Sequence, residues 1–98
     1  MLGTALGAPA GTAFGSFIAL ASHYVQNKKP EEAERSYRKG IEVAKPEDRA
    51  KAYGFLGSFY MNQDRFADAV GTLEQGIDEL PQDPLDLTYL LAHFYNMH

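Results

Sequence analysis

Three histidines, His23, His93 and His98, are the side chains of this sequence best suited to metal binding or proton transfer. Imidazole titrates near neutral pH and is the commonest metal ligand in proteins. His93 and His98 are five residues apart, a poor helical spacing for a shared metal, and His23 has no acid close in sequence to orient it. We therefore predict no metal site and no catalytic histidine.

The other residue types that carry enzyme chemistry also lack the required context. The serines are not in the sequence setting of a nucleophile elbow, and the glycines do not form a phosphate-cradling loop. Neighbouring carboxylates such as Glu31 and Glu32 fall on expected solvated helix faces. Cysteine is absent, which excludes disulfides and thiolate metal sites. We predict that the protein is not an enzyme and needs no cofactor.

Charge is spread unevenly along the 98 residues, which carry a formal net charge of −4. Eight of the nine basic residues lie between Lys28 and Lys51, and Arg65 is the only basic residue from Ala52 onward. Seven acids share that second half, namely Asp64, Asp68, Glu74, Asp78, Glu79, Asp83 and Asp86. Because nucleic-acid-binding proteins usually present a basic face, we predict no nucleic-acid partner.

Residues 1–13 form a tail rich in Gly and Ala that has no charged side chain. The tail has neither the basic start of a secretory signal nor an apolar run long enough to span a membrane. We expect a flexible tail, or part of a longer chain, and no membrane span. The compartment stays open, with the cytoplasm favoured and the periplasm as the alternative.

An internal repeat is the strongest pattern in the sequence. One four-residue set occurs three times with the same spacing: Phe17, Leu20, Ala21 and Tyr24, then Tyr53, Leu56, Gly57 and Tyr60, then Thr88, Leu91, Ala92 and Tyr95. A second set occurs twice, as Ala33, Tyr37 and Gly40 and as Ala69, Leu73 and Gly76. Residues three and four apart share one helix face, so each set predicts a contact face on a helix.

Small residues within these sets predict where paired helices approach closely. We expect Ala21 to face Ala33 and Gly40, and Gly57 to face Ala69 and Gly76. The large members, Leu20, Tyr24, Leu56, Tyr60, Leu91 and Tyr95, should fill the gaps around them, with Ala92 as the small member of the third set.

The pattern of prolines and acids predicts the helix boundaries. Pro30 and Pro46 are each followed by two acids, as at the first turn of a helix, and Asp64 can cap a helix that begins near Phe66. We predict five helices, near residues 14–27, 30–44, 47–62, 65–79 and 84–97, and no strands. The predicted fold class is all-α.

The repeated sets resemble the tetratricopeptide repeat family over about residues 14–98. The resemblance implies a right-handed superhelical array of antiparallel helix pairs, an α–α solenoid, with repeats near 14–49 and 50–84 and a partial repeat at 85–98. Phe17, Tyr53 and Thr88 stand where the family usually has tryptophan, and Gly40 and Gly76 stand where it often has alanine.

The resemblance also implies a concave groove lined by the first helix of each repeat. The candidate groove residues are Ser22, Gln26, Lys51, Phe55, Ser58, Asn62, Tyr89 and His93, with Ile18 beside them on the first helix and Met61 and Met97 as adaptable contacts. These side chains suit an extended peptide or a helix. For each aromatic residue, the alternative of packing between helices stays open.

Two functions follow from the resemblance. The first is a scaffold or adaptor, of bacterial type, that binds a protein or peptide partner in the groove. The second is a structural module that forms a homodimer through apolar residues of the last helix, namely Leu87, Leu90, Leu91, Phe94 and Tyr95.

Overall fold

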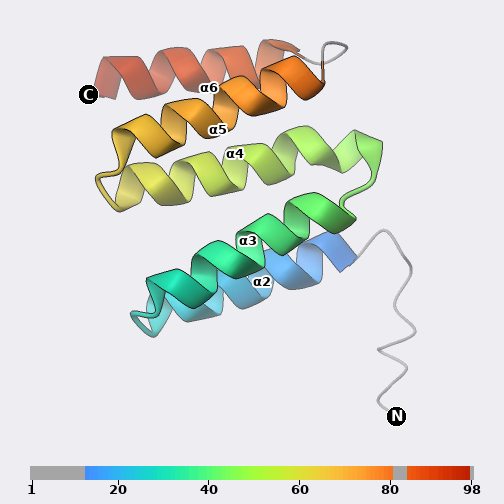
Figure 1. Cartoon of the computed structure of the whole chain (residues 1–98), viewed down its shortest axis with the longest axis vertical. Coiled ribbons are helices and arrows are strands. Elements are labelled where there is room, and N and C mark those ends of the chain that lie inside the picture. The colour runs from blue at the N-terminus through green and yellow to red at the C-terminus, as the bar shows by residue number, and fades with distance from the viewer. Residues whose placement is uncertain (1–12, 81–83, 98) are drawn as a thin grey trace. The chain divides into compact units, whose positions relative to one another are not determined.

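The computed structural model of the chain describes residues 13–80 and 84–97 and contains only helices within them (Figure 1). The helices are α2 (Ala13–Gln26), α3 (Pro30–Val43), α4 (Pro46–Asn62), α5 (Phe66–Glu79) and α6 (Pro84–Met97). The predicted all-α fold class is therefore confirmed, and each boundary lies within one residue of its predicted place. The expected flexible tail lies outside the described residues, except for Ala13, which begins α2.

Prolines begin three of the described helices, because a proline at the first helical position lacks only an N–H that the helix would leave unbonded. Pro30, Pro46 and Pro84 begin α3, α4 and α6, and acids follow in each first turn, where they complement the helix dipole. The expected cap of α5 by Asp64 is wrong. The residue before α5 is Arg65, which makes no side-chain cap bond, and Asp64 serves the preceding turn instead.

The turns after α2 and α4 have the same geometry, 36 residues apart. Lys28 and Asp64 both have a φ of 61°, in the left-handed region. The residue after each donates its backbone N–H back into the helix, Lys29 to the carbonyl of Tyr24 and Arg65 to that of Tyr60, both at 2.9 Å. A left-handed residue of this kind closes the helix end and reverses the chain. The repeat in sequence is therefore also a repeat in backbone conformation.

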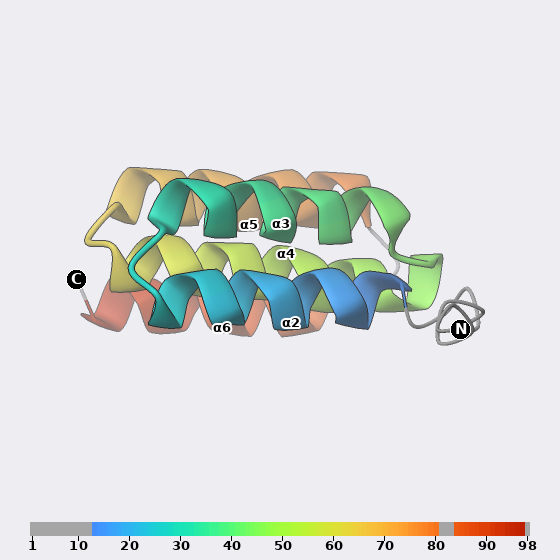
Figure 2. The ribbon, with the colours of Figure 1, turned by 90° about the horizontal axis from the view of Figure 1, so that it is seen from below.

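The chain divides into two compact units between Lys45 and Pro46. In the first unit, α2 and α3 lie side by side and antiparallel (Figures 1 and 2). Ala21 and Ala33 are fully buried in this pair, and Gly40 is buried with them. A β-carbon on Gly40 would lie 3.2 Å from Ile18 Cδ1, so the missing side chain makes room for Ile18.

In the second unit, α5 packs against both α4 and α6, and α4 also contacts α6. The largest fully buried side chains of the chain are Tyr60, Leu56, Leu73 and Leu87, all in this unit. A β-carbon on Gly57 would lie 2.9 Å from Leu73, and one on Gly76 would lie 2.7 Å from Leu87. The glycines are thus where three helices approach most closely.

The expected contacts of small residues with small residues need correction. Gly57 and Gly76 are in the helix contacts, but each receives a large side chain from the partner helix, Leu73 on Gly57 and Tyr53 on Gly76. The interiors of proteins are close-packed, and two glycines facing each other would leave a void. The repeat therefore alternates large and small residues across the interface.

A polar cluster links the first half of α4 to the last turn of α5. Tyr53 donates its hydroxyl hydrogen to a carboxylate oxygen of Glu79, whose other oxygen lies 2.5 Å from Arg49 Nε. The hydrogen bond from Arg49, and then that from Tyr53, lower the pKa of Glu79 below its ordinary 4.5. Burial, followed by the bond to Glu79, raises the pKa of Tyr53. The cluster ties the ends of this helix pair together.

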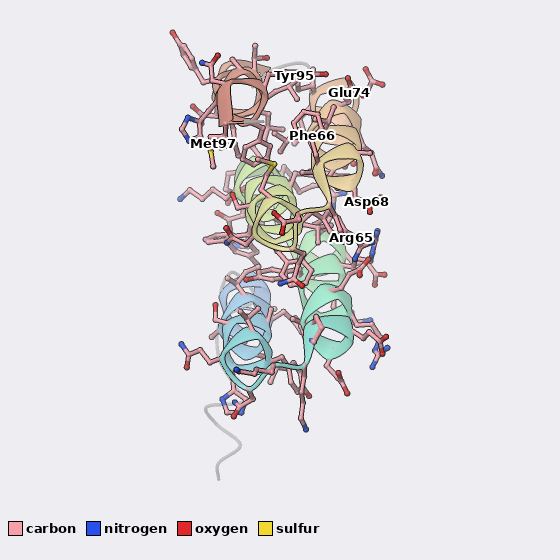
Figure 3. The ribbon with its side chains drawn as sticks, turned by 90° about the vertical axis from the view of Figure 1, so that its left-hand side faces the viewer. Arg65, Phe66, Asp68, Glu74, Tyr95 and Met97 are labelled. Atoms are coloured by element: carbon pink, nitrogen blue, oxygen red, sulfur yellow. The ribbon has the colours of Figure 1, made fainter. Side chains whose placement is uncertain are left out.

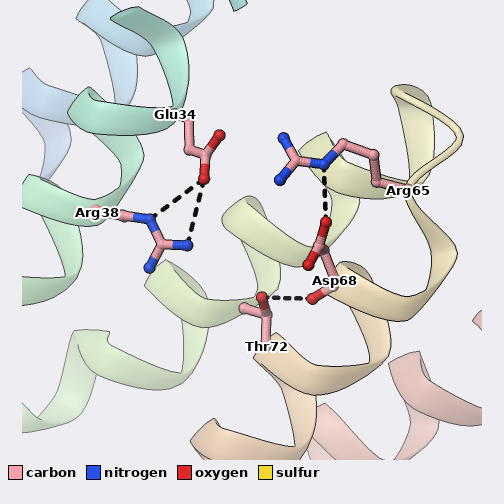
Figure 4. A network of polar contacts seen from close by, with 5 residues as sticks. All are labelled: Glu34, Arg38, Arg65, Asp68 and Thr72. Atoms are coloured by element: carbon pink, nitrogen blue, oxygen red, sulfur yellow. Dashed lines mark hydrogen bonds and ion pairs between the residues drawn. The ribbon is translucent and has the colours of Figure 1, made fainter. Parts of the chain in front are cut away.

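Ion pairs between residues three or four positions apart stabilise single helices within each unit (Figure 4). Arg38 pairs with Glu34 at 3.3 Å on α3. At the start of α5, Arg65 pairs with Asp68 at 2.8 Å, and Thr72 donates a 2.7 Å hydrogen bond to the carbonyl of Asp68. Exposed pairs of this kind contribute only about 0.2–0.5 kcal/mol each. They position the helices less strongly than the buried residues do.

Candidate interaction surface

One exposed stripe runs along α4. Lys51, Phe55 and Asn62 are exposed and Ser58 is half-buried, at positions that fall on one helix face. The opposite face carries the buried residues Tyr53, Leu56 and Tyr60. Among the large apolar residues of α4, Met61 is half-buried and Phe55 is exposed, with 44% of its surface open to solvent.

A second exposed stripe runs along α6. Tyr89, His93 and Met97 are exposed and lie on one face of the helix. Tyr89 is 72% exposed, the highest fraction among the exposed large apolar residues of the described chain. Met97 projects from the end of α6 (Figure 3).

The two stripes lie on either side of the contact between α4 and α6. A β-carbon on Gly54, next to Phe55, would lie 3.5 Å from Leu90, next to Tyr89. Because α5 packs against both helices from the other side, the two stripes share the side away from α5. We name this surface the α4–α6 surface and define it by Lys51, Phe55, Ser58, Asn62, Tyr89 and His93.

A small hollow extends the α4–α6 surface at its end. It is lined by Met61, Asp64, Phe66 and Met97. The methionines were expected there, but Asp64 and Phe66 were not, since one lies in a turn and the other on α5. No local pattern in the sequence signals this contact, which depends on how α5 enters between its neighbours.

The α4–α6 surface combines aromatic rings with a few polar side chains. Lys51 is its one basic residue, and the remaining members offer aromatic rings, an imidazole, an amide and a hydroxyl. Among the described residues, no group of three or more histidines or acids is placed to hold a metal ion. The surface can bury apolar side chains and form hydrogen bonds with a polypeptide backbone.

The candidates on α2 belong to the first unit. Ser22 and Gln26 are exposed on that helix. The placement of Ile18 beside them on the groove is wrong, because Ile18 is buried and fills the space over Gly40. Leu20, expected to fill a gap, is 41% exposed, and Tyr24 is half-buried.

The apolar residues expected to form a dimer surface on α6 divide into two groups. Leu87 and Phe94 are buried inside the second unit, where they fill the spaces over Gly76 and Gly57, so they are not accessible to a second copy. Leu90 is half-buried beside Gly54. Only Leu91, which is half-buried, and Tyr95, which is exposed, lie toward the outside of α6.

Comparison with known protein families matches this arrangement of helix pairs. Two family models described as tetratricopeptide repeat match the chain, one at residues 15–46 and the other at residues 52–88. The chain is a tetratricopeptide repeat protein. A comparison with curated proteins gives no match.

The first of these tetratricopeptide repeats coincides with the α2–α3 pair, and the second covers most of α4, all of α5 and the start of α6. Tetratricopeptide repeats generally mediate protein–protein interaction and are typically not catalytic. Within the described part of this protein, no helix is long and apolar enough to cross a membrane.

Proposed function

We propose that this tetratricopeptide repeat protein is an adaptor that binds a peptide segment of a partner protein on the α4–α6 surface. The exposure of Phe55 and Tyr89 carries the proposal. These two aromatic side chains lie on helices that contact each other, and 44% of Phe55 and 72% of Tyr89 is exposed to solvent. Exposed aromatic groups of this kind favour a protein-binding role, because folding alone gives no reason to keep them in water.

Aromatic side chains commonly dominate the free energy of protein binding. A ring that becomes buried at the centre of an interface contributes about 2 kcal/mol or more when measured by truncation to alanine. The neighbouring groups on Lys51, Asn62 and His93 can accept or donate hydrogen bonds to a peptide backbone. Met61 and Met97 at the end of the surface can adapt to different side chains.

Self-association through α6 is the alternative function, and the structure supports it less well. Leu87 and Phe94 are used inside the second unit, which leaves a smaller apolar area for a dimer. The residues from Phe66 to His98 include no Lys or Arg, so two copies that meet through this region would repel each other at low salt.

The experiment selects peptides from a displayed library against the whole chain and measures their affinity by fluorescence anisotropy. The key variant is Phe55→Ala/Tyr89→Ala, which should fold normally because both side chains are exposed. We expect the selected peptides to bind this variant at least about tenfold more weakly than the wild type.

The matched control is Tyr95→Ala, which removes another exposed aromatic residue of α6 from outside the α4–α6 surface. It should leave the affinity of the selected peptides unchanged. Peptides that bind the double variant as tightly as the wild type would place the binding site elsewhere and refute the proposal.

A further inference from the structure

The hollow at the end of the α4–α6 surface combines apolar side chains with one carboxylate. It encloses about 310 Å³ and is lined by Met61, Phe66, Met97 and Asp64. Met61 and Phe66 are half-buried, whereas Met97 and Asp64 are exposed. Figure 3 looks onto this end of the second unit, with Met97 and Phe66 labelled. A volume at the lower end of the range for ligand sites suits a single side chain of a bound peptide.

The carboxylate of Asp64 is not used by the fold. Among the residues that the structure describes, Asp64 forms no ion pair. The basic residue beside it, Arg65, pairs with Asp68 at 2.8 Å, and its guanidinium carbon lies 4.5 Å from the ring centroid of Tyr60. The negative charge of Asp64 is therefore available to a binding partner.

The turn that contains Asp64 does not require an acid. Lys28 occupies the equivalent position of the turn after α2 and has the same φ of 61°. The backbone conformation thus accepts either sign of charge. Turn geometry accounts for a left-handed residue at this position, but it does not account for a carboxylate beside two methionines.

The electrostatic potential changes sign along the α4–α6 surface. The C-terminal end of a helix carries a partial negative charge, and α4 ends at Asn62, two residues before Asp64. At a rise of 1.5 Å per residue, Lys51 lies about 16 Å from Asn62 along α4. A basic group on a partner is therefore attracted to the end that holds Asp64 and repelled at the end that holds Lys51.

The apolar lining restricts the occupant to a long basic side chain. Lysine and arginine have an apolar stem and a charged tip, and methionine side chains adapt to such a stem. A purely apolar occupant would cover the carboxylate of Asp64 without giving it a partner, which costs free energy. An acidic occupant would be repelled. Only a basic side chain satisfies both Asp64 and the methionines.

We propose that the peptide bound on the α4–α6 surface carries a Lys or Arg whose stem packs against Met61 and Met97 and whose charged group pairs with Asp64. The proposal rests on the peptide-binding function proposed for this surface. Tyr89 and Met97 are about 12 Å apart along α6, and an extended peptide advances about 3.3 Å per residue. The basic residue is therefore about three or four positions from the peptide residue that contacts Tyr89.

The peptides selected from the displayed library test the proposal first by their sequences, which should share a Lys or Arg at one position. Their affinity for Asp64→Asn, measured by fluorescence anisotropy, should be about threefold or more below that for the wild type at low salt, and the difference should narrow at high salt. Asparagine also adopts a left-handed φ, so the turn is kept. The control Asp78→Asn removes the same charge from α5, about 18 Å along the helix from Phe66, and should change the affinity less than about twofold.

A charge reversal separates pairing from damage to the turn. Asp64→Lys keeps a residue type that the equivalent turn already holds at Lys28. It should bind the selected peptides at least about tenfold more weakly than the wild type does. A peptide whose basic residue is replaced by Glu should bind Asp64→Lys more tightly than it binds the wild type, a gain that a damaged turn would not produce.

Three results would overturn the proposal. One is a set of selected peptides with no shared basic residue. Another is Asp64→Asn that binds them as tightly as the wild type does at low salt. The third is a Glu-substituted peptide that gains nothing from Asp64→Lys. If Phe55→Ala/Tyr89→Ala still weakens binding, only the pairing with Asp64 is wrong, whereas unchanged binding by that variant refutes the peptide-binding function as well.

Discussion

Two glycines of α5 should respond in opposite directions to the same substitution. A β-carbon on Gly71 would have no neighbouring atom within 4 Å, whereas one on Gly76 would lie 2.7 Å from Leu87 and 2.9 Å from Tyr53. Both glycines lie inside the helix, so both lose the same backbone freedom on folding. The environment of the added methyl group is therefore the variable that distinguishes them.

The magnitudes follow from two opposing effects. Replacing a helical glycine with alanine stabilises a protein by about 0.5–1 kcal/mol, which is the whole effect expected for Gly71→Ala. At Gly76 the methyl group also meets side chains of two other helices, and overpacking of this kind costs about 1–3 kcal/mol. One of the close atoms is Tyr53 Cβ, at 3.1 Å, which moves only with the backbone of α4. We expect Gly76→Ala to be destabilised by about 1–2 kcal/mol in total.

Urea denaturation followed by circular dichroism measures both variants against the wild type. The expected gap between Gly71→Ala and Gly76→Ala is about 1.5–3 kcal/mol, which corresponds to a difference in Tm of roughly 6 °C or more for a domain of this size. If Gly76→Ala were as stable as Gly71→Ala, the close approach of α5 to α4 and α6 would be wrong. A changed slope of the transition would instead indicate that unfolding is no longer two-state.

Three further predictions concern single residues. Lys28→Gly should stabilise the chain by about 1 kcal/mol in urea denaturation, because Lys28 has a left-handed φ that glycine adopts without steric cost. Glu79→Gln should be less stable than the wild type at pH 7, and this gap should shrink in denaturation curves as the pH falls below 4.5. The ionised Glu79, bonded to Arg49, has a lowered pKa, so its stabilisation is complete above 4.5 and is lost as the pH falls through that lower value. Tyr60→Ala should cost about 3 kcal/mol or more and Tyr95→Ala less than about 1.5 kcal/mol, as measured by urea denaturation, because only Tyr60 is buried.

Helix boundaries were predictable from the sequence because they depend on neighbouring residues. Pro30 and Pro46 fix where helices begin, and the acids after them reinforce the same boundary. The cap at Asp64 was not predictable in this way. An aspartate before a helix can act as its cap or as the left-handed residue that ends the previous helix, and only the three-dimensional path of the turn decides between them.

The partners of the small residues were harder to predict than their positions. Spacing along the chain places Gly57 and Gly76 on contact faces, but it does not say which side chain enters the space above each. Leu87 and Phe94 of α6 also enter these spaces, and they come from outside the helix pair that the repeat defines. Sequence spacing also does not predict the position of Phe66. This residue belongs to α5, yet it lines the hollow at the end of the α4–α6 surface.

Solvent exposure in the structure separates residues that the sequence repeat makes equivalent. By sequence, Tyr60 and Tyr95 are equivalent, and so are Gly57 and Ala92. The repeat predicts that each pair has the same role, yet one member is packed against α5 and the other is open to solvent. The difference between equivalent residues comes from which helices pack against each of them, and spacing along the chain does not encode that.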